Sequence, residues 1–151
     1  MKATFGAGCF WHVEDLLSKT KGVKSTKVGY VGGQLPNPTY EEVCTDKTGH
    51  VEAVEVEYDP NEISYEELLD VFWKNHNPTT LNRQGPDIGI QYRSVIFYHN
   101  DEQKEIAEKS KQTLEKSRQF ENPIVTEIVP TPTFYDAEEY HQKYFKKHGL
   151  S

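Results

Sequence analysis

The chain lacks any run of apolar residues that approaches the roughly 20 needed for a membrane-spanning helix. Residues 1–6 lead directly into turn residues, without the apolar stretch of a secretory signal peptide. Basic residues are also in the minority, since 17 Lys and Arg stand against 24 Asp and Glu and give a formal net charge of -7. A nucleic-acid-binding domain would instead show clustered Lys and Arg. These absences predict a cytoplasmic protein with no membrane anchor and no nucleic-acid partner.

Cysteine is scarce, because Cys9 and Cys44 are the only two in the sequence. Two cysteines cannot build a disulfide framework, and this pair does not form the C-x-x-C motif of metal or redox sites. None of the six histidines belongs to an H-E-x-x-H pattern. We therefore expect no metal and no bound cofactor. A lone cysteine is by default a small buried hydrophobic residue, so a functional role needs local evidence.

The length and composition predict a single catalytic domain over residues 1–151. A chain of this size, with 35% hydrophobic and 12% aromatic residues, can fill one core. Periodicity predicts a short opening strand, a helix after Cys9, and further strands at residues 23–31, 51–58, 91–98 and 124–129. Helices are predicted at residues 65–75 and 102–120, and capping pairs mark helix starts at Thr39 with Glu42, Ser64 with Glu67, and Asp136 with Glu139, the last helix ending at Lys147. This order indicates an α+β fold: a two-layer α/β sandwich with a mixed, mainly antiparallel sheet and a ferredoxin-like core.

Cys9 is the first candidate for chemistry. Glycines on both sides of Ala7 allow close approach of a ligand to the backbone, and the helix that follows Cys9 favours a thiolate at its N-terminus. Glu14 and Asp15 lie within the first two turns and offset part of that field. On these residues alone, a reactive thiol and plain core packing are equally well supported.

Two large aromatic residues, Phe10 and Trp11, follow Cys9 directly. Consecutive residues of a helix cannot point the same way, so one is expected to pack inward while the other lines a cleft. Aromatic residues taken alone are more often core.

Glu52 is the more informative residue, because it heads the apolar face of the strand at residues 51–58. It shares that face with Val54, Val56 and Tyr58. A carboxylate at a core-facing edge is costly to ionise, so its pKa is expected to rise and it can act as a proton donor. The alternative is a charged strand end that reaches solvent, and the pattern alone slightly favours it.

A Cys-dependent hydrolase or acyl transferase is one function that a reactive Cys9 would allow. It would use Cys9 and a histidine base, for which His12, His50 and His76 are the candidates. His12 lies too near Cys9 in sequence to be the usual oriented base, and no third member of such a site is evident. A further alternative is a noncatalytic module that binds methionine peptides, although an acid such as Glu52 has no use in a purely methyl-binding cleft.

Several segments in order resemble the motifs of the methionine sulfoxide reductase A family, and the match spans almost the whole chain. Each segment alone is weak evidence, whereas the ordered set is highly specific. The segments are Gly8-Cys9-Phe10-Trp11, Asn37-Pro38-Thr39-Tyr40 with Glu41-Glu42-Val43-Cys44, Thr48-Gly49-His50-Val51-Glu52, Arg83-Gln84-Gly85-Pro86-Asp87 with Gln91-Tyr92-Arg93-Ser94, and Phe134-Tyr135-Asp136-Ala137-Glu138 with His141-Gln142.

The resemblance implies a reductase that returns oxidised methionine, free or in proteins, to methionine. Cys9 would attack the sulfur of a methionine S-sulfoxide, while Glu52, Tyr40 and Tyr92 hold and protonate its oxygen. A sulfoxide oxygen leaves poorly until it is protonated, which gives an un-ionised carboxylic acid a clear purpose.

The resemblance also implies roles for three residues around the reacting sulfur. Phe10 and Trp11 would cradle the substrate methyl group. Asp87 matches a family position near the pocket, where it would support Tyr92 or a water molecule.

Recycling of the enzyme is where the sequence departs from the family's commonest pattern. Cys9 would end as a sulfenic acid that something must reduce. Many relatives use a cysteine in a glycine-rich C-terminal tail or one just after the Phe-Trp pair, where this chain has His12. Only Cys44 is left, and we expect it to be buried on a short helix with a raised pKa. This favours a one-cysteine cycle with an external thiol reductant, glutathione or glutaredoxin rather than the usual thioredoxin.

Overall fold

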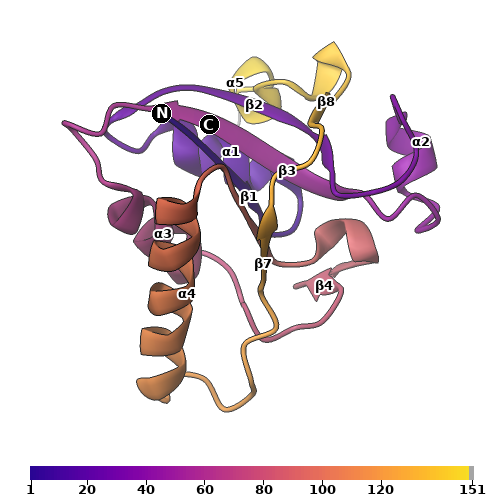
Figure 1. The fold of residues 1–151 in the computed structure, drawn as a ribbon. Coiled ribbons are helices and arrows are strands. Elements are labelled where there is room, and N and C mark those ends of the chain that lie inside the picture. Colours follow the sequence, from indigo (N-terminus) through magenta and orange to yellow (C-terminus); the bar gives the residue numbers. More distant parts are fainter. Residues whose placement is uncertain (150–151) are drawn as a thin grey trace.

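The computed structural model describes residues 1–149, whose main element is a six-stranded sheet of order β7-β6-β1-β3-β2-β8 (Figure 1). The β6-β7 pair is parallel and the other neighbouring pairs are antiparallel. A mixed, mainly antiparallel sheet with helices confirms the expected α+β class. The strands are β1 (Lys2–Gly6), β2 (Val23–Val31), β3 (Val51–Tyr58), β6 (Val95–Tyr98), β7 (Glu127–Pro130) and β8 (Tyr135–Asp136), and β4 (Arg83–Gln84) pairs separately with β5 (Asp87–Ile88).

Three of the helices begin at residues whose side chains cap them. Thr39 and Ser64 each cap a helix through a complete capping box, with Glu42 and Glu67 as partners. The longest helix is capped instead by Asn100, whose side chain accepts from the backbone of Gln103. The helices are α1 (Phe10–Ser18), α2 (Tyr40–Val43), α3 (Tyr65–Lys74), α4 (Asp101–Lys116) and α5 (Tyr144–Lys147), with 3-10 turns η1 (Ile90–Tyr92) and η2 (Glu139–His141).

The sheet buries both of its faces. The larger hydrophobic cluster joins Val54 and Val56 of β3 to side chains of α1, α3 and α4. A smaller cluster, which includes Val51 and Ala53, lies on the opposite face. The alternation along β3 therefore places Glu52 on the same face as α1 and α3, as the sequence pattern indicates.

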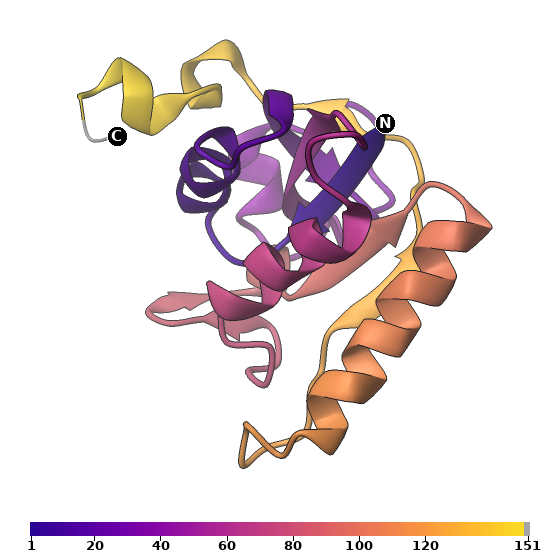
Figure 2. The same cartoon turned by 90° about the vertical axis from the view of Figure 1, so that its left-hand side faces the viewer.

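The C-terminal part of the chain lies beside α1, at the opposite end of the molecule from α4 (Figure 2). Helices α3 and α4 contact each other, and α4 also packs against β6 and β7. The contact between α5 and α1 brings residues 144–147 next to the helix that follows Cys9.

Three predicted elements are present in the structure with different bounds. Of residues 91–98, Gln91 and Tyr92 belong to the 3-10 turn η1, and the strand begins only at Val95. The predicted strand at residues 124–129 begins at Glu127, because Val125 bonds instead to the carbonyl of Pro78. Helix α4 ends at Lys116 rather than at Phe120, since Arg118 adopts a left-handed conformation with φ 55°.

The predicted final helix capped by Asp136 and Glu139 is wrong. Asp136 pairs in β8 with Gly29, and the chain then makes η2 and the four-residue α5. Lys143 between them has φ 52°, which interrupts any continuous helix. The Asp-x-x-Glu pattern is a local signal, and pairing with β2 overrides it.

Candidate active site

Cys9 lies at the N-cap of α1, with extended backbone at φ -61° and ψ 123°. The turn that delivers it needs glycine at position 8, where φ is +92°. A Cβ at Gly8 would come within 2.8 Å of the Gln84 side chain. The turn therefore lies against the Gln84 side chain of β4, and the half-buried Cys9 follows it directly.

The helix N-terminus is expected to lower the pKa of the Cys9 thiol, but burial has the larger effect and the pKa is raised. Burial raises the pKa of the thiol to about 11, and the charges of Glu52 and Asp87 raise it further. Hydrogen bonds from the backbone of Trp11 and His12 lower the pKa but do not offset the burial. Cys9 is therefore protonated at neutral pH in the structure as it stands.

Glu52 is almost fully buried, at 1% exposure, and lies close to the start of α1. Its Oε1 accepts a hydrogen bond from the backbone N–H of Phe10 at 3.3 Å, whereas Oε2 is buried without a partner among residues 1–149. Burial raises the pKa of this carboxyl group to about 8, the Phe10 hydrogen bond lowers it, and the charge of Asp87 raises it. Glu52 is thus mainly un-ionised at neutral pH, and the solvent-exposed strand end that the pattern alone slightly favours is wrong.

Tyr40 and Tyr92 form one side of the same site. Burial raises the pKa of Tyr92 to about 12, and the charge of Glu52 adds to the shift. The pKa of Tyr40 is also raised, by burial first and then by a hydrogen bond to Cys44. The charge of Glu52 contributes to the raised pKa values of Tyr40, Tyr92 and Cys44, so the two phenols and the Cys44 thiol lie near this carboxyl group.

Cys44 is exposed, so its expected burial on α2 is wrong. It forms the C-cap of α2 rather than lying within the helix. Partial desolvation of its sulfur still raises the pKa of the thiol, while the hydrogen bond from Tyr40 lowers it.

Phe10 and Trp11 divide as expected for consecutive helical residues. Phe10 is buried at 1% exposure and packs against Tyr30 with ring centroids 5.8 Å apart. Trp11 is half-buried, and its Nε1 donates to Nδ1 of His141 at 3.0 Å. The indole stacks on Tyr144 at 3.7 Å, with the two planes 5° apart.

Asp87 lies in β5, is half-buried and is close enough to the site to influence the pKa values of its residues. Its charge contributes to the raised pKa values of Cys9, Glu52 and Tyr92. The structure therefore brings together all seven residues that the sequence singled out.

Two site residues were not identified from the sequence as such. Glu138 accepts from the hydroxyl of Tyr30 at 2.9 Å and from the backbone N–H of Tyr40 at 3.0 Å, and so fixes the start of α2. His141 is buried at 1% exposure, with its ring 4.6 Å from that of Tyr40 and 5.1 Å from that of Phe10. Both residues lie in the last of the segments that resemble the family's motifs, and Tyr30, a phenol on a buried strand face that needs a polar partner, is a further signal.

The structure does not support a Cys–His site. His50 has its Nδ1 bonded to Gly33 N–H at 3.0 Å and its Nε2 2.7 Å from the carbonyl of Leu35. Both nitrogens of His76 are likewise occupied, by the Phe72 carbonyl and by Ser94. His12 is exposed and makes an edge contact with Phe145.

The described residues were also compared with the requirements of a metal site and of a membrane-spanning helix. Within residues 1–149, no group of three or more His, Cys, Asp or Glu side chains is arranged to hold a metal ion. No helix in the same residues is long and apolar enough to cross a membrane.

Comparison with known proteins agrees with the geometry. The family model "Peptide methionine sulfoxide reductase" matches residues 1–150. The chain is 64% identical to the peptide methionine sulfoxide reductase MsrA of Methanothermobacter thermautotrophicus, covering 97% of this chain and 86% of that protein.

Solved structures give the same result. Mxr1 from Saccharomyces cerevisiae in its reduced form matches with a TM-score of 0.93 and 38% identity, over 100% of this chain and 87% of that one. Mxr1 in complex with Trx2 matches with a TM-score of 0.68 and 30% identity, over 95% and 84% of the two chains. The chain therefore belongs to the peptide methionine sulfoxide reductase A family and is an oxidoreductase that reduces methionine sulfoxide.

Proposed function

We propose that the chain reduces the S epimer of methionine sulfoxide, free or within proteins, with Cys9 as the nucleophile and Glu52 as the acid. The observation that carries this proposal is the burial of Glu52 beside the start of α1, with a pKa raised by that burial to about 8. A carboxyl group that keeps its proton at neutral pH can give it to a sulfoxide oxygen.

The proposed reaction is a two-electron exchange between two sulfur atoms. Cys9 Sγ, having lost its proton, attacks the sulfoxide sulfur while Glu52 protonates the oxygen. The hydroxyl then passes from the substrate sulfur to Cys9 Sγ, which becomes a sulfenic acid. The bond between the two sulfur atoms breaks, and its electron pair stays on the substrate sulfur. The substrate is reduced to the thioether, and the proton from the thiol balances the one that Glu52 gave.

The remaining site residues have supporting roles in this proposal. Tyr40 and Tyr92, whose phenols keep their protons because burial raises their pKa values, donate hydrogen bonds to the sulfoxide oxygen. Phe10 and Trp11 hold the methyl group, as their packing next to Cys9 favours. Asp87 acts at a distance, through its charge or through a bridging water molecule.

The sulfenic acid requires an external thiol reductant. The complex of Mxr1 with Trx2 supports a thioredoxin as the partner of this chain, whereas the sequence favoured glutathione or glutaredoxin. The one-cysteine cycle remains part of the proposal, because the raised pKa of Cys44 slows its attack on the sulfenic acid. A cycle that consumes thiols suits the cytoplasm, where glutathione and thioredoxin keep thiols reduced.

We further propose that the chain acts as one catalytic domain with a ferredoxin-like core. The central strand order β6-β1-β3-β2, with α1 following β1 and α3 following β3, supports this description.

The proposal is tested by incubating the protein with the separate S and R sulfoxides and dithiothreitol, followed by product analysis. We expect methionine from the S epimer only. Equal turnover of both epimers, or turnover of R alone, contradicts the proposal.

A further inference from the structure

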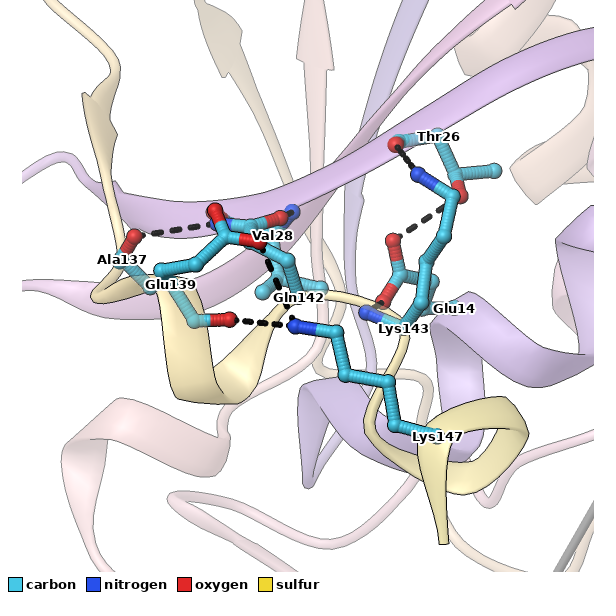
Figure 3. Close-up of polar contacts among 8 residues, drawn as sticks. All are labelled: Glu14, Thr26, Val28, Ala137, Glu139, Gln142, Lys143 and Lys147. Carbon is cyan, nitrogen blue, oxygen red and sulfur yellow. Dashed lines mark hydrogen bonds and ion pairs between the residues drawn. The ribbon is translucent and has the colours of Figure 1, made fainter. Parts of the chain in front are cut away.

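The C-terminal segment, residues 137–148, is fixed to the sheet by side chains that replace missing strand partners (Figure 3). Gln142 accepts from Val28 N–H at 2.9 Å and donates to the carbonyl oxygens of Val28, at 2.9 Å, and Ala137, at 3.0 Å. Its amide thus continues the pairing of β8 with β2 for one more position.

Glu14 provides a second anchor from α1. Its side chain is buried at 2% exposure, and its two carboxyl oxygens accept hydrogen bonds from two different donors. Oε2 accepts from the Thr26 hydroxyl at 2.9 Å, and Oε1 accepts from the backbone N–H of Lys143 (Figure 3). A buried carboxylate is costly unless it is hydrogen-bonded, so its place inside the protein depends on these two donors.

Lys143 adopts a conformation that needs support. Its φ of 52° and ψ of 41° lie in the left-handed region, which is unfavourable for a residue other than glycine. The residue separates η2 from α5, so its conformation sets the directions in which the chain enters and leaves. The hydrogen bond to Glu14 fixes the backbone N–H at this bend.

The bend at Lys143 places two residues in contact with the indole of Trp11. His141, two positions before Lys143, accepts the indole N–H at 3.0 Å. Tyr144, the next residue after Lys143, stacks on the indole with centroids 3.7 Å apart. Because an indole N–H can only donate, Nδ1 of His141 is the acceptor, and the neutral ring carries its proton on Nε2.

We propose that Glu14 is a positioning residue for Trp11, acting through the bend at Lys143 that holds His141 and Tyr144 against the indole. The effect on catalysis rests on the proposed function, in which Trp11 lines the pocket for the substrate methyl group. Glu14 itself touches no reacting atom. Its loss should loosen one wall of the pocket and leave Cys9 and Glu52 in place.

The test uses two matched pairs of variants. In Glu14→Gln, the amide oxygen can accept from Lys143 N–H and the amide nitrogen can donate to the Thr26 hydroxyl, so the anchor is retained. Glu14→Leu removes both hydrogen bonds at similar volume. On the other side of the contact, Lys143→Gly favours the left-handed bend, whereas the β-branched Lys143→Val opposes it.

The first readout is the mobility of Trp11, measured by fluorescence anisotropy in a Trp73→Phe background that leaves one indole. We expect Glu14→Leu and Lys143→Val to lower the anisotropy, and Glu14→Gln and Lys143→Gly to match the parent. Lys147→Ala is the control, because it removes only contacts with the exposed Glu139 inside the segment. Unchanged anisotropy in Lys143→Val, and in Glu14→Leu if that variant folds, overturns the proposal.

The second readout is the steady-state kinetics with the S-sulfoxide, in which the changes in KM and in kcat are compared. We expect the two disrupting variants to raise KM by about tenfold and to change kcat by less than about twofold, since a looser wall weakens binding uniformly. Trp11→Leu separates this inference from the proposed function. If Trp11→Leu leaves KM unchanged, the role of Trp11 in the pocket is wrong, while the anisotropy still decides whether Glu14 positions the indole.

Discussion

The backbone N–H of Phe10 donates to Oε1 of Glu52 at 3.3 Å, so the first residue of α1 holds the candidate acid beside the candidate nucleophile. The two partners are 42 positions apart in sequence. The same turn that ends β1 and begins α1 therefore places both Cys9 and the hydrogen-bond donor to Glu52. The charge of Glu52 accordingly raises the pKa of the Cys9 thiol.

Cys9→Ser should abolish turnover and leave the fold intact. Serine is a favoured N-cap residue, so the substitution should preserve or strengthen the start of α1. Methionine formation from the S-sulfoxide and thermal unfolding of the purified variant provide the two measurements. Activity close to that of the wild type would exclude Cys9 as the nucleophile.

Glu52→Gln should slow formation of the sulfenic acid, because an amide cannot give a carboxylic proton to the sulfoxide oxygen. General acid catalysis contributes roughly 10²- to 10⁴-fold, which sets the expected loss in the single-turnover rate. An unchanged rate would mean that Glu52 is only a buried strand residue.

The control for this variant is the titration of Cys9. Ionised Glu52 raises the pKa of the Cys9 thiol, so Glu52→Gln should lower it from about 11. Thiolate absorbance against pH measures the change. A slower reaction despite a more readily formed thiolate would assign the loss to the missing proton and not to a weaker nucleophile.

The buried carboxyl group also predicts how stability depends on pH. The folded pKa of Glu52, about 8, lies above the ordinary value of 4.5 for a glutamate side chain, so the folded state holds this proton more tightly than the unfolded state. The resulting stabilisation is complete below about pH 4.5 and is lost as pH rises towards about 8. Relative to Glu52→Gln, the free energy of unfolding should fall by about 1.4 kcal/mol per pH unit within that window.

Urea unfolding of both proteins between pH 5 and pH 8 measures this difference. The comparison with Glu52→Gln removes the contributions of the other titrating groups. Parallel stability curves for the two proteins would show that Glu52 has a normal pKa.

Elements with local signals were predictable from the sequence. The capping boxes at Thr39 and Ser64 depend only on neighbouring residues, and both are present in the structure. The alternation that put Glu52 on the core-facing side of β3 is likewise a property of one strand. The capping pattern at Asp136 predicted a helix that does not form, because Asp136 pairs with Gly29, which is far away in sequence.

The site was predictable as a set of residues but not as an electrostatic environment. The sequence indicates a thiol at a helix N-terminus, yet it does not show that burial and two carboxyl groups raise the pKa of Cys9. Nor does it show that Glu138 joins Tyr30 to Tyr40, because those contacts span about 100 residues. Such effects arise only from the packing of distant segments.

The last prediction concerns how Cys9 is recycled, and its starting point is the position of Cys44. That thiol is exposed, so access does not prevent its attack on a sulfenic acid. Its raised pKa argues the other way, because less of it is present as thiolate at neutral pH. We expect the second effect to dominate, so that one turnover without reductant leaves a sulfenic acid at Cys9.

Dimedone should trap that sulfenic acid, and Cys44→Ser should recycle with an added thioredoxin or glutathione at nearly the wild-type rate. A disulfide between Cys9 and Cys44 would instead require their Cα atoms to come within about 7 Å of each other. Mass spectrometry of the oxidised protein distinguishes the two products. A loss of two hydrogens without a dimedone adduct would refute the one-cysteine cycle, because it would mean that the exposed Cys44 reaches Cys9 before any external thiol does.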